Sequence, residues 1–330
     1  MNIIGVEQLV YGSEDVAAAT KFYEDWGLEA TGKSAEGADF ALPDRTTIHI
    51  RRIDDPALPP ASVPGSTVRE CVWGVKDAAS LKAIGAELSR DREVTEDAEG
   101  TLHSMDEHGY RIGFRVTRRD FAPNALPHIN TVGVPVRTNT RAEGALKHRV
   151  RQLRISHVVY WAPGDTARAA RFYTERLGFK VTESAKVLGY FLRGALSHDH
   201  HNLFLHRNGD NYGFQHVAFE VRDLDEVMMC GNHMEEQGWK SHLGPGRHVM
   251  GSNSYWYFWN PAGGVAECSS DMDFITDDWV TKEHDTPPHG GIGWYARPSD
   301  ANLRPGHGDW PRLAEALGPV PAAEARSAAE

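Results

Sequence analysis

The sequence has few cysteines, no long apolar run and no excess of basic residues, and each absence excludes a class of protein. The three cysteines (Cys71, Cys230 and Cys268) form no CxxC pair, which argues against a disulfide framework and favours a cytoplasmic location. No apolar run approaches the roughly 18 residues that a membrane span needs, and the N-terminus does not read as a signal peptide. The formal net charge of −11 argues against nucleic acid as a partner.

The composition is that of a globular protein. Of the 330 residues, 40% are hydrophobic and 25% are charged, which is inconsistent with disorder and leaves ample length for a core. This length suits one large domain or two ordinary ones.

The chain repeats itself. VEQLVYGSEDVAAATKFYEDWGLEAT (6–31) is similar to ISHVVYWAPGDTARAARFYTERLGFKVT (155–182), and VRECVWGVKDAASLKAIGAELS (68–89) to FQHVAFEVRDLDEVMMCGNHMEEQG (214–238). Each stretch reads as a strand followed by a helix, and further short strand-like runs follow each helix. The pattern predicts an α+β fold of tandem βαβββ modules that form two barrel-like domains, each curved around a cavity.

Local signals mark the ends of two predicted helices. Asp165 is placed as the N-cap of the first helix in the second half, and Gly178 follows its end. Asp223 with Glu226 forms a variant of the capping box, and Gly238 closes that helix.

These repeats define the predicted domains. Residues 1–117 form an N-terminal module and residues 154–282 a C-terminal module. The segment 118–153 lacks clear periodicity and is interpreted as a linker. Residues 283–330, rich in Pro, Gly and Ala, are interpreted as a tail that wraps the surface and then frays.

Three residues in separate strand-like runs form a candidate metal site. These are His157 in RISHVVYW, His216 in GFQHVAFEV and Glu267 in GGVAECSS. A single histidine at such a place is more often a satisfied core residue. Two histidines at equivalent places of related units, with a carboxylate from a third strand, favour the facial set that holds non-heme Fe(II).

The N-terminal half provides an internal control. Alignment of the repeats sets His157 opposite Glu7 and His216 opposite Glu70, and Glu267 falls near Gly113. This half therefore lacks the set and is predicted to bind no metal.

Further candidates lie near these three residues in the sequence. The stretch HDHHNLFLH contains competing histidines, and alternation with Leu203 and Leu205 favours an inward-facing His201, with His200 as the alternative. His248 follows a GPGR turn. Tyr257 is expected opposite Glu267 on an antiparallel strand joined by the NPAGG turn. Without that spacing, His248 would be an ordinary turn residue and Tyr257 one more aromatic of SYWYFW.

Together these residues resemble those of the type I extradiol ring-cleaving dioxygenases of the vicinal oxygen chelate superfamily, which has a glyoxalase-like fold. The resemblance covers roughly residues 3–295 and is specific in the C-terminal half. It implies meta cleavage of a catechol-type aromatic diol by O₂, giving a muconic semialdehyde-type product, in aromatic hydrocarbon catabolism. It also implies Fe(II), favoured over Mn(II), and a homo-oligomer.

The resemblance further implies roles for the site residues. His157, His216 and Glu267 would hold the metal, His201 would act as general acid/base, and Tyr257 with His248 would stabilise the ionised substrate oxygen. At position 243, where homoprotocatechuate-cleaving relatives carry an arginine, this chain has Leu243, which lowers the odds of that carboxylated substrate. A substituted or fused-ring catechol is the preferred class.

Two rival interpretations remain open. Glyoxalase-type isomerases and 4-hydroxyphenylpyruvate-type dioxygenases use similar metal sites, although they are not expected to carry the His201, His248 and Tyr257 set. A metal-free small-molecule binding protein of the same fold is the second rival. The intact His-His-Glu set argues against it.

Overall fold

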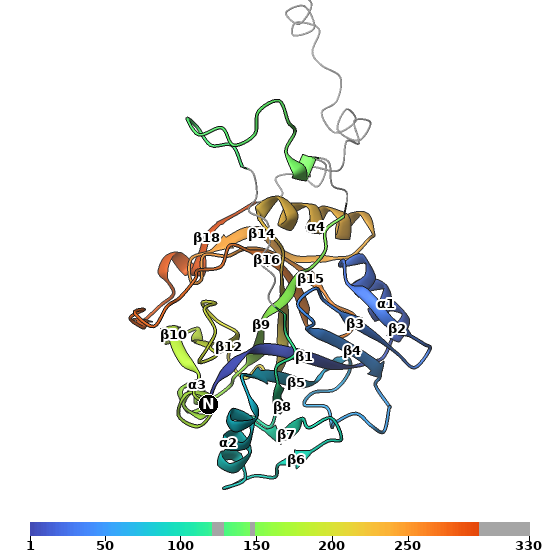
Figure 1. Cartoon of the computed structure of the whole chain (residues 1–330), viewed down its shortest axis with the longest axis vertical. Helices are drawn as coiled ribbons and strands as arrows, with labels where there is room; N and C mark the ends of the chain where they lie inside the picture. The colour runs from blue at the N-terminus through green and yellow to red at the C-terminus, as the bar shows by residue number, and fades with distance from the viewer. Residues whose placement is uncertain (121–128, 146–148, 297–330) are drawn as a thin grey trace, which may run out of the picture.

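The protein consists of two mixed β-sheets that lie side by side (Figure 1). The computed structural model describes residues 1–120, 129–145 and 149–296. The N-terminal sheet has the strand order β2-β3-β4-β1-β5-β8-β7-β6, and the C-terminal sheet has the order β17-β10-β11-β12-β9-β13-β16-β15-β14-β18.

A strand–helix–three-strand unit occurs four times, as the sequence repeats predict. The N-terminal sheet is built from β1 (Ile3–Ser13), α1 (Val16–Asp25), β2 (Glu29–Lys33), β3 (Gly37–Ala41), β4 (Thr47–Arg52), β5 (Thr67–Val75), α2 (Ala78–Leu88), β6 (Thr95–Glu96), β7 (Leu102–Met105) and β8 (Arg111–Val116). The C-terminal sheet is built from β9 (Arg154–Trp161), α3 (Thr166–Arg171) with the π-helical turn η2 (Phe172–Arg176), β10 (Lys180–Ala185), β11 (Gly189–Arg193), β12 (Leu203–His206), β13 (Gly213–Glu220), α4 (Leu224–Glu236), β14 (Ser241–His248), β15 (Ser254–Trp259) and β16 (Val265–Ser270).

The four units pair in the same way. In each, the first strand lies parallel to the last, giving the pairs β1–β4, β5–β8, β9–β12 and β13–β16. The two units of each sheet then join through their first strands in the antiparallel pairs β1–β5 and β9–β13. The predicted α+β fold of tandem βαβββ modules is confirmed.

The predicted helix ends are also present. The Asp165 side chain accepts a hydrogen bond from the Arg168 amide, and the Asp223 side chain accepts one from the amide of Glu226. Gly178 and Gly238 follow the helix ends with φ of 76° and 86°, a left-handed conformation that favours glycine.

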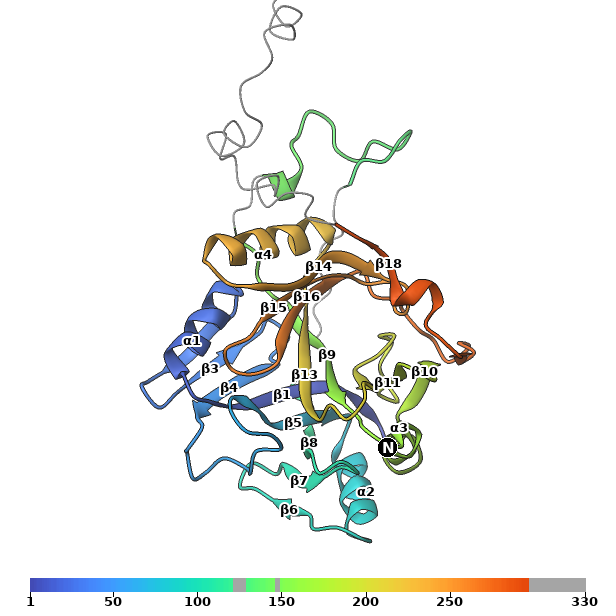
Figure 2. The ribbon, with the colours of Figure 1, turned by 180° about the vertical axis from the view of Figure 1, so that it is seen from behind.

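The two halves share one hydrophobic core. Trp26 on the N-terminal side lies edge-on to Phe258 with ring centroids 5.9 Å apart, and Trp73 lies edge-on to Phe179 at 5.1 Å. Both pairs are buried, and such aromatic contacts add to the free energy of burial. In the reverse view, β1 and β9 lie where the two sheets meet (Figure 2).

The first part of the segment 283–330, which is predicted to be a tail, contributes strands to the C-terminal sheet. β17 (Lys282–His284) pairs in parallel with β10, and β18 (Ile292–Tyr295) pairs with β14, so both join the C-terminal sheet. The turn η3 (Pro288–Gly291) precedes β18. The sequence did not indicate these strands, because each is short, lies at an edge of the sheet and is flanked by Pro and Gly. Residues 297–330 lie outside the described part of the chain.

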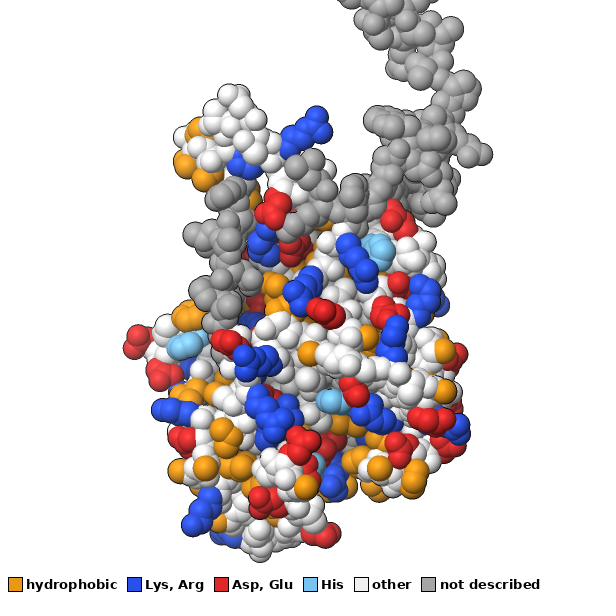
Figure 3. All heavy atoms as spheres, turned by 45° about the vertical axis from the view of Figure 1, so that its right-hand side comes forward, with side chains coloured by type: hydrophobic (Ala, Val, Ile, Leu, Met, Phe, Trp, Pro, Cys, Tyr) orange, Lys and Arg blue, Asp and Glu red, His pale blue; other side chains and the backbone are white. Residues whose placement is uncertain are grey.

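The predicted linker contributes no strand to either sheet in its described portions, which contain one short 3₁₀ turn, η1 (Glu143–Ala145). On the face seen in Figure 3, acidic and basic side chains are interspersed. No described helix combines the length and the apolarity that crossing a membrane requires.

Candidate metal centre and cavity

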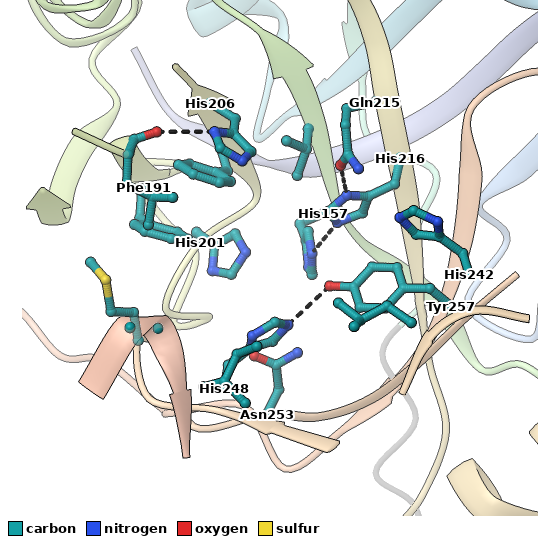
Figure 4. Close-up of a pocket in the computed structure, with 18 residues that line it drawn as sticks. His157, Phe191, His201, His206, Gln215, His216, His242, His248, Asn253 and Tyr257 are labelled. Carbon is teal, nitrogen blue, oxygen red and sulfur yellow. Dashed lines mark hydrogen bonds between the residues drawn. The ribbon is translucent and has the colours of Figure 1, made fainter. Parts of the chain in front are cut away.

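Three strands bring the predicted metal ligands together. His157 lies on β9, His216 on β13 and Glu267 on β16, and all three side chains are buried. The register explains their meeting, because Ala218 of the central strand β13 pairs with both His157 and Glu267. His216 lies two residues before Ala218, on the same face of the strand. Figure 4 shows both imidazoles projecting into one cavity.

The three ligand atoms form a compact triangle. The His157 Nε2 and His216 Nε2 atoms are 3.2 Å apart, and Glu267 Oε2 lies 3.1 and 3.2 Å from them. Two ligand atoms about 2.1–2.2 Å from one metal ion are about 3.0–3.1 Å apart at octahedral angles, against about 3.4–3.6 Å at tetrahedral angles. The observed triangle therefore fits a face of an octahedral site.

The hydrogen bonds of Glu267 also fit a metal. Its Oε1 atom accepts a hydrogen bond of 2.9 Å from the Asn253 amide. Its Oε2 atom is buried and accepts none, although both imidazoles are near it. A buried carboxylate oxygen without a donor is costly in a folded protein. A cation held between Oε2 and the two Nε2 atoms would remove that cost.

The far sides of both imidazoles are held in place. The Nδ1 atom of His157 is hydrogen-bonded to Ser156 Oγ at 3.1 Å, and His216 Nδ1 is hydrogen-bonded to Gln215 Oε1. Partners of this kind orient histidine ligands and select the tautomer that presents a free Nε2.

Burial and neighbouring charges set the protonation states of the site residues. Burial lowers the pKa of His216 to about 4, so its imidazole is neutral at pH 7. Burial alone would raise the pKa of the Glu267 carboxyl, but the close imidazoles of His157 and His216 outweigh burial, and the pKa falls well below its usual range. The result is a neutral His216 imidazole beside an ionised Glu267 carboxylate, the protonation states in which these two residues bind metal.

The equivalent positions of the N-terminal sheet carry no such set. There Val72 pairs with Gln8 and Gly113, as Ala218 pairs with His157 and Glu267. Glu70, two residues before Val72, corresponds to His216 as predicted. The counterpart of His157 is therefore Gln8 and not Glu7. Both first strands carry the same bulge, at Glu7 and at Ser156, but the stretch from strand to helix N-cap is one residue shorter in the N-terminal half, from Gln8 to Asp15 against His157 to Asp165.

The cavity beside the triangle has a volume of about 220 Å³. Its polar lining comes from His157, His201, His206, Gln215, His216, His242, His248, Asn253 and Tyr257. Its apolar lining comes from Val159, Leu188, Phe191, Phe204, Leu243, Met250 and Ile292. Gly290, Gly291 and Ile292 belong to η3 and β18, so part of the predicted tail forms one wall.

His201 lines the cavity, whereas His200 is fully buried behind it. The structure thus places the favoured histidine at the cavity, but the alternation argument for it is wrong. β12 begins only at Leu203, and Leu203 and Leu205 face the main core on the opposite side from the cavity. Burial, with the nearby histidine charges, holds the pKa of His201 far below its usual value.

Tyr257 and His248 lie side by side at the cavity. Their OH and Nε2 atoms are hydrogen-bonded at 3.0 Å (Figure 4). Tyr257 pairs with Glu267 across β15 and β16, which is the predicted arrangement around the NPAGG turn. Burial first, and then the nearby Glu267 charge, raise the pKa of the Tyr257 phenol well above its usual value, so it is a proton donor at neutral pH.

Sequence reasoning missed the residues that form the apolar wall. Phe191 and Phe204 stack with centroids 4.0 Å apart and line the cavity. Of the aromatic run SYWYFW, Tyr257 lines the cavity, whereas Trp256 and Phe258 pack into the core. Alternation along β11 and β12 would have put Phe191 and Phe204 on one face, yet it could not show which face bears the cavity.

Comparison with known proteins supports this architecture. Residues 154–266 match the family model of the Glyoxalase/Bleomycin resistance protein/Dioxygenase superfamily. This segment contains two residues of the triangle, His157 and His216, and ends one residue before the third, Glu267.

Two curated relatives match the sequence of this chain. Metapyrocatechase 2 of Cupriavidus necator is 35% identical over 195 residues, which span 59% of this chain and 59% of that protein. The iron-dependent extradiol dioxygenase of Rhodococcus jostii (strain RHA1) is 24% identical over 280 residues, 79% of this chain and 88% of the relative. The first match thus spans less than two thirds of the relative's length.

Solved structures share the fold. The Mn(II)-bound glyoxalase of Novosphingobium aromaticivorans has a TM-score of 0.68 at 23% identity, covering 89% of this chain and 91% of its own. BphC, a halotolerant catechol dioxygenase, has a TM-score of 0.69 at 16% identity, covering 92% and 98%. The whole chain therefore has the glyoxalase-like fold of these structures, residues 154–266 match the superfamily model, and the predicted resemblance to extradiol dioxygenases is confirmed.

Proposed function

We propose that this protein is an extradiol dioxygenase that cleaves a catechol-type aromatic diol with O₂ at an Fe(II) held by His157, His216 and Glu267. The observation that carries the proposal is the triangle of ligand atoms with edges of 3.1–3.2 Å, open to a cavity that His201, His248 and Tyr257 also line. The iron-dependent relative supports Fe(II), and the Mn(II)-bound glyoxalase shows that this fold also accommodates Mn(II).

Bound Fe(II) would supply the redox chemistry that allows a closed-shell aromatic ring to react with O₂. The protein supplies proton transfer and positioning. A neutral His201 accepts the proton of a catechol hydroxyl, because burial keeps its imidazole unprotonated at neutral pH. The Tyr257–His248 pair provides hydrogen bonding for the catechol oxygen that becomes ionised.

The cavity favours an uncharged substrate with an apolar substituent. Among the described lining residues there is no lysine, arginine, aspartate or glutamate. Leu243 lines the rim, and the nearby Arg247 is paired with Asp271 at 2.8 Å and does not line the cavity. Phe191 and Phe204 offer a flat apolar surface. A carboxylated catechol would find no fixed positive charge among these residues.

The proposal extends to the setting of the protein. The three cysteines are free and buried, which supports a reducing cytoplasm. A homo-oligomer and the domain boundaries at 117, 153 and 282 stay predictions.

The test is metal analysis of anaerobically purified protein beside a spectrophotometric screen of catechol, 3-methylcatechol, 2,3-dihydroxybiphenyl and carboxylated catechols in air. We expect about one iron per chain and a rising yellow absorbance that is fastest with the apolar-substituted catechols. Bound metal without ring cleavage of any catechol would contradict the proposal and favour an isomerase of the same fold. Absence of metal binding after Fe(II) addition would favour a binding protein.

A further inference from the structure

A chain of hydrogen bonds leads from the cavity histidine to the protein surface. His201 Nδ1 is 3.1 Å from His200 Nδ1, and His200 Nε2 is 3.1 Å from Glu183 Oε2. The other carboxylate oxygen, Glu183 Oε1, is 2.6 Å from His284 Nε2. His200 and Glu183 are buried, whereas the His284 side chain is 26% exposed.

The chain is built by elements far apart in the sequence. Glu183 lies on β10, and His284 lies on β17, which pairs with β10 next to it. The short strand β17 therefore has a specific consequence, because it brings His284 within hydrogen-bonding distance of the carboxylate. Nothing in the metal triangle requires these contacts.

The direction of the hydrogen bonds follows from the donors and acceptors. Glu183 is ionised at neutral pH: burial alone would raise the pKa of its carboxyl, but hydrogen bonding to His200 and His284 outweighs this and lowers the pKa. A carboxylate only accepts, so His200 Nε2 must carry a proton. With the His200 proton on Nε2, its Nδ1 atom can accept, and the contact between the two Nδ1 atoms assigns the shared proton to His201 Nδ1.

We infer that Glu183 and His200 are positioning residues that hold His201 in its Nδ1–H tautomer, so that its free Nε2 can accept the proton of the substrate hydroxyl. His201 projects its ring into the cavity (Figure 4), which places Nε2 on the substrate side. The opposite tautomer would present a donor where the reaction needs a base. His284 orients the carboxylate from its exposed side. The catalytic part of this inference rests on the proposed function, whereas the tautomer itself does not.

The first readout is independent of activity. In zinc-loaded protein labelled with ¹⁵N-histidine, with the His201 signals identified by their loss in His201→Phe, we expect a proton on Nδ1 and none on Nε2. Glu183→Gln should produce the opposite or a mixed tautomer. A proton on Nε2 in the parent protein, or an unchanged tautomer in Glu183→Gln, would overturn the inference.

The second readout is the rate of ring cleavage in the iron-loaded protein. Glu183→Gln should lower kcat by about 10- to 100-fold with little change in KM or iron content, in the range seen when partners of site histidines are lost. The milder His284→Asn, at a partly exposed position, should lower kcat by about 2- to 10-fold, the value of one hydrogen bond. If the Glu183→Gln protein folds poorly, His284→Asn and Glu183→Asp replace it. We expect Glu183→Asp, which keeps the charge, to retain most of the rate, and His284→Asn to show the loss of about 2- to 10-fold.

Glu70→Gln is the matched control. Glu70 is also buried and lies 2.7 Å from a histidine, His103, but in the N-terminal sheet. The Glu70→Gln variant should leave kcat and the His201 tautomer unchanged. Equal losses in Glu70→Gln and Glu183→Gln would overturn the inference. Lack of cleavage by the parent protein would instead refute the proposed function, and the ¹⁵N measurement would still decide the tautomer.

Discussion

Tyr257 lies directly opposite Glu267 across the antiparallel strands β15 and β16. One cross-strand pair therefore supplies both a candidate metal ligand and a phenol beside the candidate metal centre. His248 completes the group, since its Nε2 atom is 3.0 Å from the phenol oxygen and 4.0 Å from Glu267 Oε1.

Because Tyr257 and His248 are hydrogen-bonded, they should act as a unit. We expect Tyr257→Phe and His248→Asn each to lower kcat by roughly 10- to 100-fold, and the double variant to lose little more than either single one. Steady-state kinetics of the three variants, each with its iron content, checks this. Losses that multiply in the double variant would show that the two residues act separately.

Removal of one residue of the triangle should abolish metal binding. We expect His157→Ala and Glu267→Ala to purify without iron and without ring-cleaving activity, because two remaining ligands hold a divalent ion weakly. Elemental analysis and the absorbance assay measure both losses. His206→Phe is a suitable control, since His206 lines the same cavity but bonds the Leu188 carbonyl and not the triangle. Full iron content in either alanine variant would disprove the assignment.

His201 should matter for proton transfer and not for metal binding. We expect His201→Phe to keep its iron and to lose about 10²- to 10⁴-fold in kcat, the usual contribution of a positioned general acid/base. Phenylalanine has nearly the shape of the imidazole and suits a site next to Phe191. Single-turnover kinetics on iron-loaded protein provides the measurement, and a kcat near that of the parent would assign the base elsewhere.

Acid should remove the metal. The folded-state pKa of His216, about 4, lies below the ordinary value of 6.5, so the unfolded chain takes up this proton first as the pH falls. For the metal-free protein, this residue's contribution to stability is full above about pH 6.5 and is lost as the pH falls to about 4. Protons compete with metal for the same nitrogen. We expect full iron content after dialysis at pH 7 and little below about pH 4, and retention at pH 3.5 would contradict this.

Leu243 offers a test of substrate charge. Its side chain lines the cavity and is 38% exposed, so a longer side chain can extend toward solvent. We expect Leu243→Arg to lower KM for 3,4-dihydroxyphenylacetate by about 10-fold, the order of one charge-assisted hydrogen bond. The KM for 3-methylcatechol should stay unchanged or rise. An equal effect on both substrates would indicate a change of cavity shape and not of charge.

The sequence was sufficient to predict the four-unit fold and the three residues of the candidate metal site. The four βαβββ units follow from local periodicity and turn residues, which each segment carries by itself. His157, His216 and Glu267 could be selected because repeated units place equivalent residues at equivalent points of a sheet. The same comparison failed by one residue at Gln8, because an alignment on the helices carries over to the strands only if the connections are equally long, and the stretch from Gln8 to the N-cap Asp15 is one residue shorter than that from His157 to Asp165.

Only the tertiary structure decided which face of β11 and β12 bears the cavity. It also added β17 and β18 to the C-terminal sheet, and it placed Glu183 next to His200, with His284 on the other side of the carboxylate. These relationships join residues up to about a hundred positions apart, since Glu183 and His284 meet only when β17 pairs with β10. Periodicity reports how a segment divides into two faces. It does not report what packs against either face, because that depends on the packing of the whole chain.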